Sequence, residues 1–136
     1  MRENNFVILF SSIRKKIYKL LNSKLKNYNI SIIEALYLII ISDEEYISFK
    51  ELTRKADCDK GMTTKVLVKL KMMEFVTYDT KNISITNKGL DVSNEIKDIL
   101  KKIRDRLSNK IGKDKLNNIY EELSEFNNIL EGEIKC

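Results

Sequence analysis

Residues 60–73 combine an apolar stripe with a row of lysines and threonines, a pattern that suits binding to a ligand. The residues expected to face the core recur at helical spacing and form one stripe: Thr63, Val66, Leu67, Leu70 and Met73. Polar and cationic residues lie outside or beside this stripe: Lys60, Thr64, Lys65, Lys69 and Lys71. Because phosphates are anionic and base edges in the major groove offer hydrogen-bond acceptors, such a face suits a nucleic acid. The segment therefore predicts a helix that can enter the major groove.

The residue types that the chain lacks exclude most enzyme chemistry. Histidine is absent from the 136 residues, which removes Ser-His and Cys-His catalysis and imidazole metal sites. Two cysteines, Cys58 and Cys136, cannot form a zinc site alone. No nucleophile–base pair or carboxylate cluster stands at an interpretable spacing. We therefore expect no enzyme, metal or cofactor, and a reduced, cytoplasmic protein, since nothing marks the chain as secreted.

Capping signals indicate the helices that position this segment. Proline is absent and glycine occurs only four times, so long helices are expected. Two capping boxes open successive helices: Ser31 with Glu34 begins a helix over 32–42, and Ser48 with Glu51 begins a short helix to about Ala56. After a three-residue turn, Asp59 is the expected N-cap of the helix 60–73.

The period then changes to that of a small β-hairpin. The β-prone runs 75–78 and 83–85 flank a tip over 79–82. This order of elements predicts a winged helix-turn-helix over residues 30–89: two helices, a turn, a third helix and a hairpin. In that architecture a short helix crosses the DNA backbone and supports the recognition helix in the major groove. The predicted fold class is mainly α with a small β-hairpin wing.

Long amphipathic helices flank this core. They are expected over 5–28, from about 87 to Gly112, and over 113–130. A chain of 136 residues suits a single domain, residues 1–136. The first of these helices carries a lysine-rich polar face, for which three interpretations stay open: a solvated surface, phosphate contact or membrane-surface binding.

Three stretches carry a resemblance to a known family. They are Leu52-Thr53-Arg54-Lys55-Ala56, Leu70-Lys71-Met72-Met73-Glu74-Phe75-Val76 and Ile85-Thr86-Asn87-Lys88-Gly89. In their order and spacing, the chain resembles the MarR family of bacterial regulators and its SarA-like branch. The Ile-Thr-x-Lys-Gly segment after the hairpin is the most telling match. The resemblance implies a sequence-specific DNA-binding transcriptional regulator.

The resemblance also implies a homodimer on double-stranded DNA. In this family the first helix and the last two, here 5–28 and 87–131, pack against their counterparts. Each recognition helix, here Lys60–Met73, then enters one half of a pseudo-palindromic operator. The apolar surface of the flanking helices is consistent with this, because it exceeds what the small core needs. The alternative is that these helices only wrap their own domain.

The candidate DNA-binding residues follow from the recognition helix and the hairpin. They are Ser48, Lys50, Lys60, Gly61, Thr64, Lys65, Lys69, Lys81 and Asn82. Gly61 either allows close approach of the backbone to DNA or is a neutral substitution. The wing is shorter than is usual in the family and lacks its Asp-x-Arg motif. Since lysine lacks the planar fork of arginine, we expect weaker, more salt-sensitive and less selective binding.

Further candidates concern regulation. Tyr18, Tyr28, Tyr37 and Phe126 are either core residues or the lining of a cleft for a small-molecule ligand of unknown identity. Cys58 is expected as a small buried hydrophobe, with a redox sensor as the alternative. Cys136 is terminal and could form intermolecular disulfides. The alternative function is a winged-helix protein-interaction module with reduced DNA affinity, and a peripheral membrane protein is the third hypothesis, although no membrane partner is expected.

Overall fold

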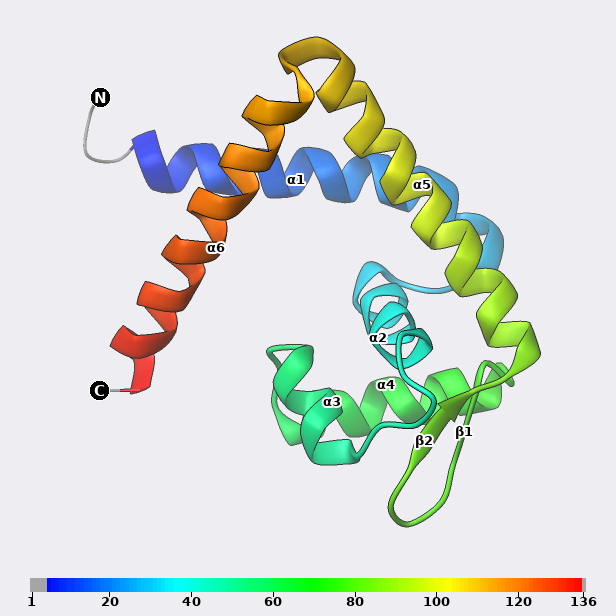
Figure 1. Cartoon of the computed structure of the whole chain (residues 1–136). Helices are drawn as coiled ribbons and strands as arrows, with labels where there is room; N and C mark the ends of the chain where they lie inside the picture. Colours follow the sequence, from blue (N-terminus) through cyan, green and yellow to red (C-terminus); the bar gives the residue numbers. More distant parts are fainter. Residues whose placement is uncertain (1–4, 136) are drawn as a thin grey trace. The chain divides into compact units, whose positions relative to one another are not determined.

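A computed structural model describes residues 5–135, and it confirms a mainly α chain with one β-hairpin (Figure 1). The elements are α1 (Asn5–Leu25), the 3₁₀ turn η1 (Lys26–Tyr28), α2 (Ile32–Ser42), α3 (Phe49–Lys55), α4 (Lys60–Met72), β1 (Val76–Tyr78), β2 (Ile83–Ile85), α5 (Asn87–Ile111) and α6 (Lys113–Lys135). The chain divides between Ile99 and Leu100 into two compact units. A single domain over 1–136 stays a prediction.

Helix α2 is the centre of the first unit. Its predicted capping box forms, because the backbone N–H of Ser31 donates to Glu34 Oε1 at 2.7 Å and the Ser31 hydroxyl accepts from the backbone N–H of Glu34. Tyr37, Leu38 and Ile41 have no exposed surface. Since α1, α3, α4 and β2 all pack on α2, this apolar helix is the core on which the other elements are placed.

Helices α3 and α4 form the helix-turn-helix. Ser48 caps α3 by accepting from the backbone N–H of Glu51 at 3.1 Å. The predicted second capping box is only half formed, because the Glu51 carboxylate takes the guanidinium of Arg54 instead. Asp57 has a φ of 56°, which turns the chain sharply. Asp59 then caps α4 as predicted, accepting from the backbone N–H of Met62 at 2.8 Å.

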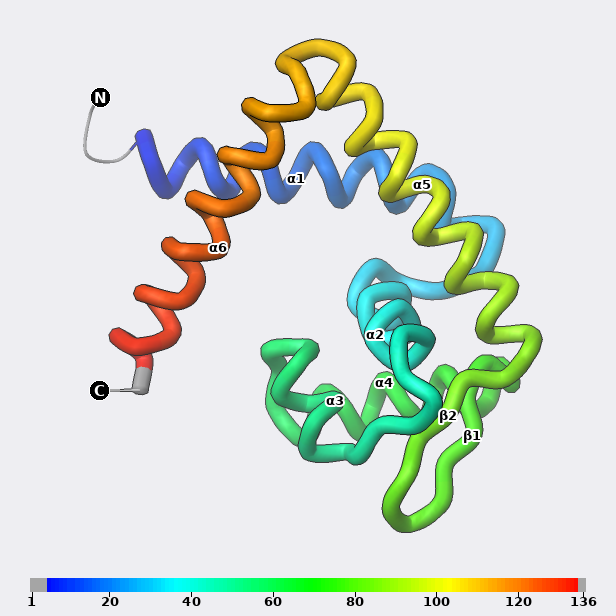
Figure 2. Tube along the Cα trace, viewed as in Figure 1, coloured from blue at the N-terminus to red at the C-terminus, as the bar shows by residue number. Residues whose placement is uncertain are grey.

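Strands β1 and β2 form the hairpin of the wing (Figure 2). They pair antiparallel, with Val76 opposite Ile85. A third segment joins the hairpin, which the sequence pattern did not indicate. Ile47 and Ile83 exchange both backbone hydrogen bonds, at 2.9 and 2.8 Å. The connector between α2 and α3 is thereby tied to the wing, so the wing is held from both sides of the helix-turn-helix.

The Ile-Thr-x-Lys-Gly segment is the joint between the wing and α5. The Thr86 hydroxyl accepts from the backbone N–H of Gly89 at 3.0 Å and donates to the carbonyl of Glu74 at 2.6 Å. A Cβ at position 89 would lie 2.1 Å from the carbonyl oxygen of Phe75. Only glycine fits this close approach of two backbones, which is the physical reason for the motif.

The second unit contains the end of α5 and the whole of α6. Gly112, with a φ of 91°, ends α5 as predicted, since a left-handed residue stops a helix there at little cost. Helix α6 continues to Lys135, five residues beyond the predicted end at Leu130. Helix α1, in the first unit, instead ends earlier than expected, at Leu25, and continues as η1.

Within residues 5–135 no single helix is long and apolar enough to cross a membrane. Helix α1 with η1, taken together with α2, meets the length and composition criterion only as a pair bent by 79°.

We predict that Gly89→Ala lowers the free energy of unfolding by about 3 kcal/mol, because the new methyl group must displace the backbone at Phe75. Gly132→Ala is the matched control, since nothing lies within 4 Å of its added Cβ. It should raise stability by about 0.5 kcal/mol through helix propensity. Chemical denaturation of both variants checks this, and equal stability of the two would contradict the close approach at Gly89.

Candidate nucleic-acid interface

Helix α4 separates into a buried and an outward face. Thr63, Val66, Leu67 and Leu70 are buried as predicted, whereas Met73 follows the helix as its C-cap and is half-buried. The outward face carries Gly61, Thr64, Lys65 and Val68, all exposed. No Asp or Glu occurs within Lys60–Met72. The outward face is therefore free of acids that would repel a phosphate backbone.

A buried hydroxyl cluster sets how this face is presented. The Oγ1 atom of Thr63, which has no exposed surface, lies 2.8 Å from the Oη atom of Tyr37 on α2 and 2.9 Å from Oγ1 of Thr53 on α3. Thr53 in turn donates to the carbonyl of Phe49 at 2.8 Å. Because these bonds join α2, α3 and α4 away from solvent, they restrict the angle at which α4 stands.

Lys69 is turned toward α2. Its Nζ atom lies 2.9 Å from Oε1 of Glu34, whose side chain is 9% exposed against 44% for that of Lys69. Burial alone would raise the pKa of Glu34, but hydrogen bonds from the backbone of Ser31 and from Lys69 outweigh it and leave the pKa lowered. The charge of Lys69 is thus paired within the fold, and its contact with DNA stays a prediction.

The other predicted residues of α3 and α4 are placed at the surface. Lys50, Lys60, Gly61, Thr64 and Lys65 are exposed. Within the described part of the chain, Lys60 and Lys65 have no acidic partner. The Thr64 hydroxyl donates to the carbonyl of Lys60 at 2.9 Å. Ser48 is exposed, and its hydroxyl accepts the N-cap hydrogen bond of α3.

The wing tip is a tight turn held by Asp79. Its Oδ1 atom accepts the backbone N–H groups of Lys81 and Asn82, each at 2.8 Å. These two hydrogen bonds favour the ionised carboxylate and lower the pKa of Asp79. The side chains of Lys81 and Asn82 are exposed. The tip therefore presents a lysine and an amide on a rigid turn, beside an acid whose role was not predicted.

A groove of about 280 Å³ runs between α4 and the wing. Thr64, Leu67 and Val68 line it from α4, and residues 78–81 line it from the wing. Lys71 lies over the ring of Tyr78, 4.5 Å from its centroid. Sequence reasoning missed Val68 and Tyr78 as site residues. The available signal was the position of Val68, an apolar residue one place beyond the buried stripe.

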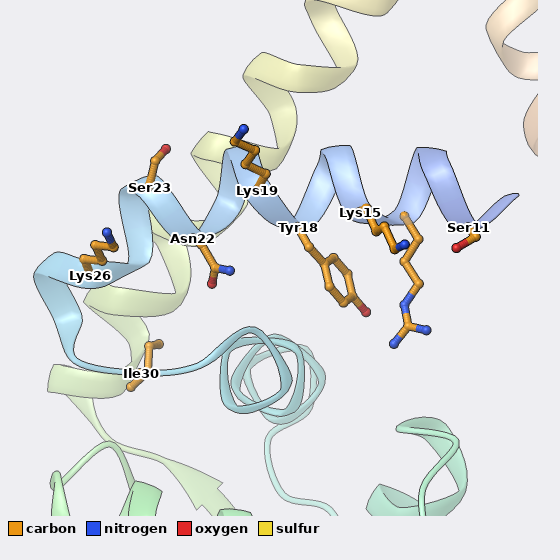
Figure 3. Close-up of a pocket in the computed structure, with 9 residues that line it drawn as sticks. Ser11, Lys15, Tyr18, Lys19, Asn22, Ser23, Lys26 and Ile30 are labelled. Atoms are coloured by element: carbon orange, nitrogen blue, oxygen red, sulfur yellow. The ribbon is translucent and has the colours of Figure 1, made fainter. Parts of the chain in front are cut away.

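A second concave surface lies along α1 (Figure 3). It has a volume of about 750 Å³ and is lined by Ser11, Arg14, Lys15, Tyr18, Lys19, Asn22, Ser23, Lys26 and Ile30. Arg14 lies over the ring of Tyr18, at 5.1 Å from its centroid. Four cations and no acid line this cavity, which therefore suits an anion.

The other candidates for a ligand cleft differ in their burial and in the unit to which they belong. Tyr37 is a core residue with no exposed surface, whereas Tyr28 is half-buried in a shallow depression beside α5. Phe126 belongs to the second unit. Cys58 is half-buried and its Sγ donates to the carbonyl of Ala56 at 3.3 Å, so it is less enclosed than expected. Cys136 lies outside the described residues.

Comparisons of sequence identify named relatives, although no protein-family model matches the chain. It is 30% identical over 108 residues to the HTH-type transcriptional regulator SarZ of Staphylococcus saprophyticus, covering 74% of each chain. It is 29% identical over 125 residues to SarZ of Staphylococcus epidermidis, covering 87% of this chain and 83% of the relative.

Comparisons of structure identify the same fold in solved proteins. A MarR protein from Peptoclostridium difficile matches with a TM-score of 0.87 at 18% identity, over 98% of this chain and 92% of that one. A Staphylococcus aureus MarR, solved in complex with salicylate and kanamycin, matches at 0.84 and 21% identity, over 96% and 93%. Ligand-free NadR also matches at 0.84, with 17% identity, over 93% and 98%.

The Glu34–Lys69 pair predicts an acid-sensitive link between α2 and α4. Since the folded-state pKa of Glu34 is lowered, its stabilising contribution is present above the unfolded value of about 4.5 and is lost as the pH falls through the folded value. We expect Glu34→Gln to lower the free energy of unfolding at pH 7 by about 1–2 kcal/mol. It should also flatten the loss of stability below pH 4.5.

Glu51→Gln is the matched control, because Glu51 occupies the same position of α3, three residues after the N-cap, and its side chain is 42% exposed. It should change stability much less, since exposed ion pairs contribute little. Denaturation series from pH 7 to pH 3 test this. Parallel pH profiles of the wild type and Glu34→Gln would contradict the link.

Proposed function

Because the chain belongs to the MarR family of winged helix-turn-helix transcriptional regulators, we propose that it binds a pseudo-palindromic DNA operator as a homodimer, with α4 in the major groove. It is a DNA-binding regulator and not an enzyme. The observation that carries the proposal is the outward face of α4. This face is exposed, has no acid, and is supported from behind by buried hydrogen bonds to α2 and α3.

Two lysines are the proposed phosphate contacts at this face. Lys60 stands at the first turn of α4 and Lys65 about one turn later, both exposed. Lysines whose charge is not neutralised by a nearby acid retain their full attraction for phosphates. Lys81 at the rigid wing tip is the proposed third contact, to the backbone flanking the groove. Its point charge supports affinity more than selectivity.

The homodimer is supported by apolar residues that a single protomer leaves exposed. On α1 they are Phe6, Val7, Ile8, Leu9, Phe10 and Ile13, and on α6 they include Ile119, Leu123, Phe126 and Leu130. Those of α6 recur at spacings of three and four residues, so they share one face. Apolar faces of this extent are rarely left to water, and a second copy of the same helices is the partner we propose.

A small-molecule ligand stays a prediction. Of the structural neighbours, NadR was solved with 4-hydroxyphenylacetate and the Staphylococcus aureus MarR with salicylate and kanamycin. The cavity on α1 supports an organic anion in this chain, because Arg14, Lys15, Lys19 and Lys26 line it together with Tyr18. The cations suit a carboxylate and the ring suits an apolar or aromatic body.

The role of the lysines is tested by the salt dependence of binding to an operator selected from random DNA. Lys60→Gln and Lys65→Gln should each reduce the slope of log affinity against log salt by about two, because each removes one phosphate contact from each of the two protomers. Lys110→Gln, at the exposed end of α5, removes the same charge away from α4 and should leave the slope unchanged. An equal effect of all three variants would contradict the proposed contacts.

If the wild type binds no DNA even at low salt, the alternative gains: a winged helix that binds another protein. The exposed apolar residues Val68 and Met72 on α4 are the observation that favours it.

The dimer is tested by the mass of the free protein in solution. We expect twice the 16.0 kDa of one chain. Leu123→Glu should yield monomers, because it places a charge in the apolar face of α6 where the side chain of the single protomer is 40% exposed. Asn118→Glu adds the same charge off that face and should leave the dimer intact. A wild-type protein that sediments as a monomer at micromolar concentration would overturn the proposal.

A further inference from the structure

The outward face of α4 carries methyl groups that phosphate binding does not use. Val68 is 47% exposed. It follows Gly61, Thr64 and Lys65 at spacings of seven, four and three residues, so these four positions share one face of the helix. The core does not need Val68, because the buried stripe of α4 is complete without it. A β-branched residue is also a weaker helix former than alanine, so neither packing nor helix propensity explains it.

Thr64 adds a second methyl group to this face. Its hydroxyl proton is already donated to the carbonyl of Lys60 at 2.9 Å. The hydroxyl therefore has no proton left to donate to a ligand, and the side chain offers its acceptor lone pairs and its methyl group. Both Thr64 and Val68 line the groove between α4 and the wing, on the side from which the wing tip flanks the recognition helix.

The remaining residues of α4 restrict which base edges it can read directly. Helix α4 has no Asp or Glu to accept from the amino group of cytosine, and no Asn or Gln to form the paired hydrogen bonds with adenine. Its polar readers are lysines and threonines. The one apolar feature that base pairs display in the major groove is the C5-methyl group of thymine.

Resting on the proposed function, we propose that Val68 and Thr64 read thymine C5-methyl groups, so that each operator half-site carries thymine beneath the middle of α4. Gly61 belongs to the same surface. A Cβ there would meet only Asp59 Oδ1, at an ordinary 3.5 Å, so the fold does not require glycine at this position. Its missing side chain leaves room for the helix to approach the bases closely.

The test compares operators that contain thymine with operators that contain deoxyuridine, which lacks only the C5-methyl group. The operator is first selected from a random DNA pool with the wild-type protein. Deoxyuridine is then placed at single half-site positions, and outside the half-sites as a control. We expect a loss of about fourfold in affinity at the positions read by α4, the effect of removing one buried methyl group from the interface, and no loss at the control positions.

Protein variants assign the methyl groups. Val68→Ala should bind thymine and deoxyuridine operators equally at the position that it reads. Thr64→Ser removes the methyl group and keeps the hydroxyl, so it should abolish discrimination at its own position. Thr64→Val keeps a methyl group, so it should preserve the discrimination between thymine and deoxyuridine at that position. Circular dichroism of each variant confirms that α4 is still folded.

The outcomes separate this inference from the function on which it rests. Tight binding of the selected operator with no preference for thymine over deoxyuridine would overturn the recognition of thymine methyl groups. The proposed DNA-binding function would still hold. Discrimination that persists unchanged in Val68→Ala and Thr64→Ser would overturn the assignment to these two residues. Absence of binding to any DNA would overturn both proposals together.

Discussion

The structure depends on one buried hydroxyl, that of Thr63. Its oxygen lies within hydrogen-bond distance of Oη of Tyr37 on α2, of Oγ1 of Thr53 on α3 and of the carbonyl oxygen of Asp59, at 2.8, 2.9 and 3.2 Å. All three interactions lie where the helix-turn-helix meets the core helix. A hydroxyl without partners in such a place would carry a desolvation cost of about 1–3 kcal/mol. The polar cluster therefore favours one angle between α3 and α4, and with it one presentation of the outward face.

The wing is held in place by backbone contacts with two other segments. The connector after α2 pairs with the wing through Ile47 and Ile83, while Gly89 brings the start of α5 against the carbonyl of Phe75. Two short strands alone are barely stable in water. The contacts with the connector after α2 and with the start of α5 therefore stabilise the hairpin. A rigid wing beside a rigid α4 makes a groove of defined width, and this groove is where Val68 and Thr64 are placed.

The charges of this face are divided between folding and binding. Lys69 is paired with Glu34, so its charge contributes to the packing of α4 on α2. Lys60 and Lys65 have no acidic partner within residues 5–135, which is why we propose them as phosphate contacts. Lys69 therefore differs from Lys60 and Lys65 of the same helix, and residue type alone does not distinguish them. Their positions around the helix, relative to α2, make the difference.

The local features of the chain could be predicted from its residues: the bounds of α2, the caps at Ser31 and Asp59, most of the buried stripe of α4 and the hairpin. Each depends on residues a few places apart, whose periodicity and capping pattern can be recognised in the sequence. Three long-range contacts could not be predicted in this way: Lys69 pairs with Glu34, 35 residues away, Ile47 pairs with the wing, and Gly89 lies against Phe75. These contacts arise only when helices pack, because packing sets which side chains meet across elements that the sequence separates.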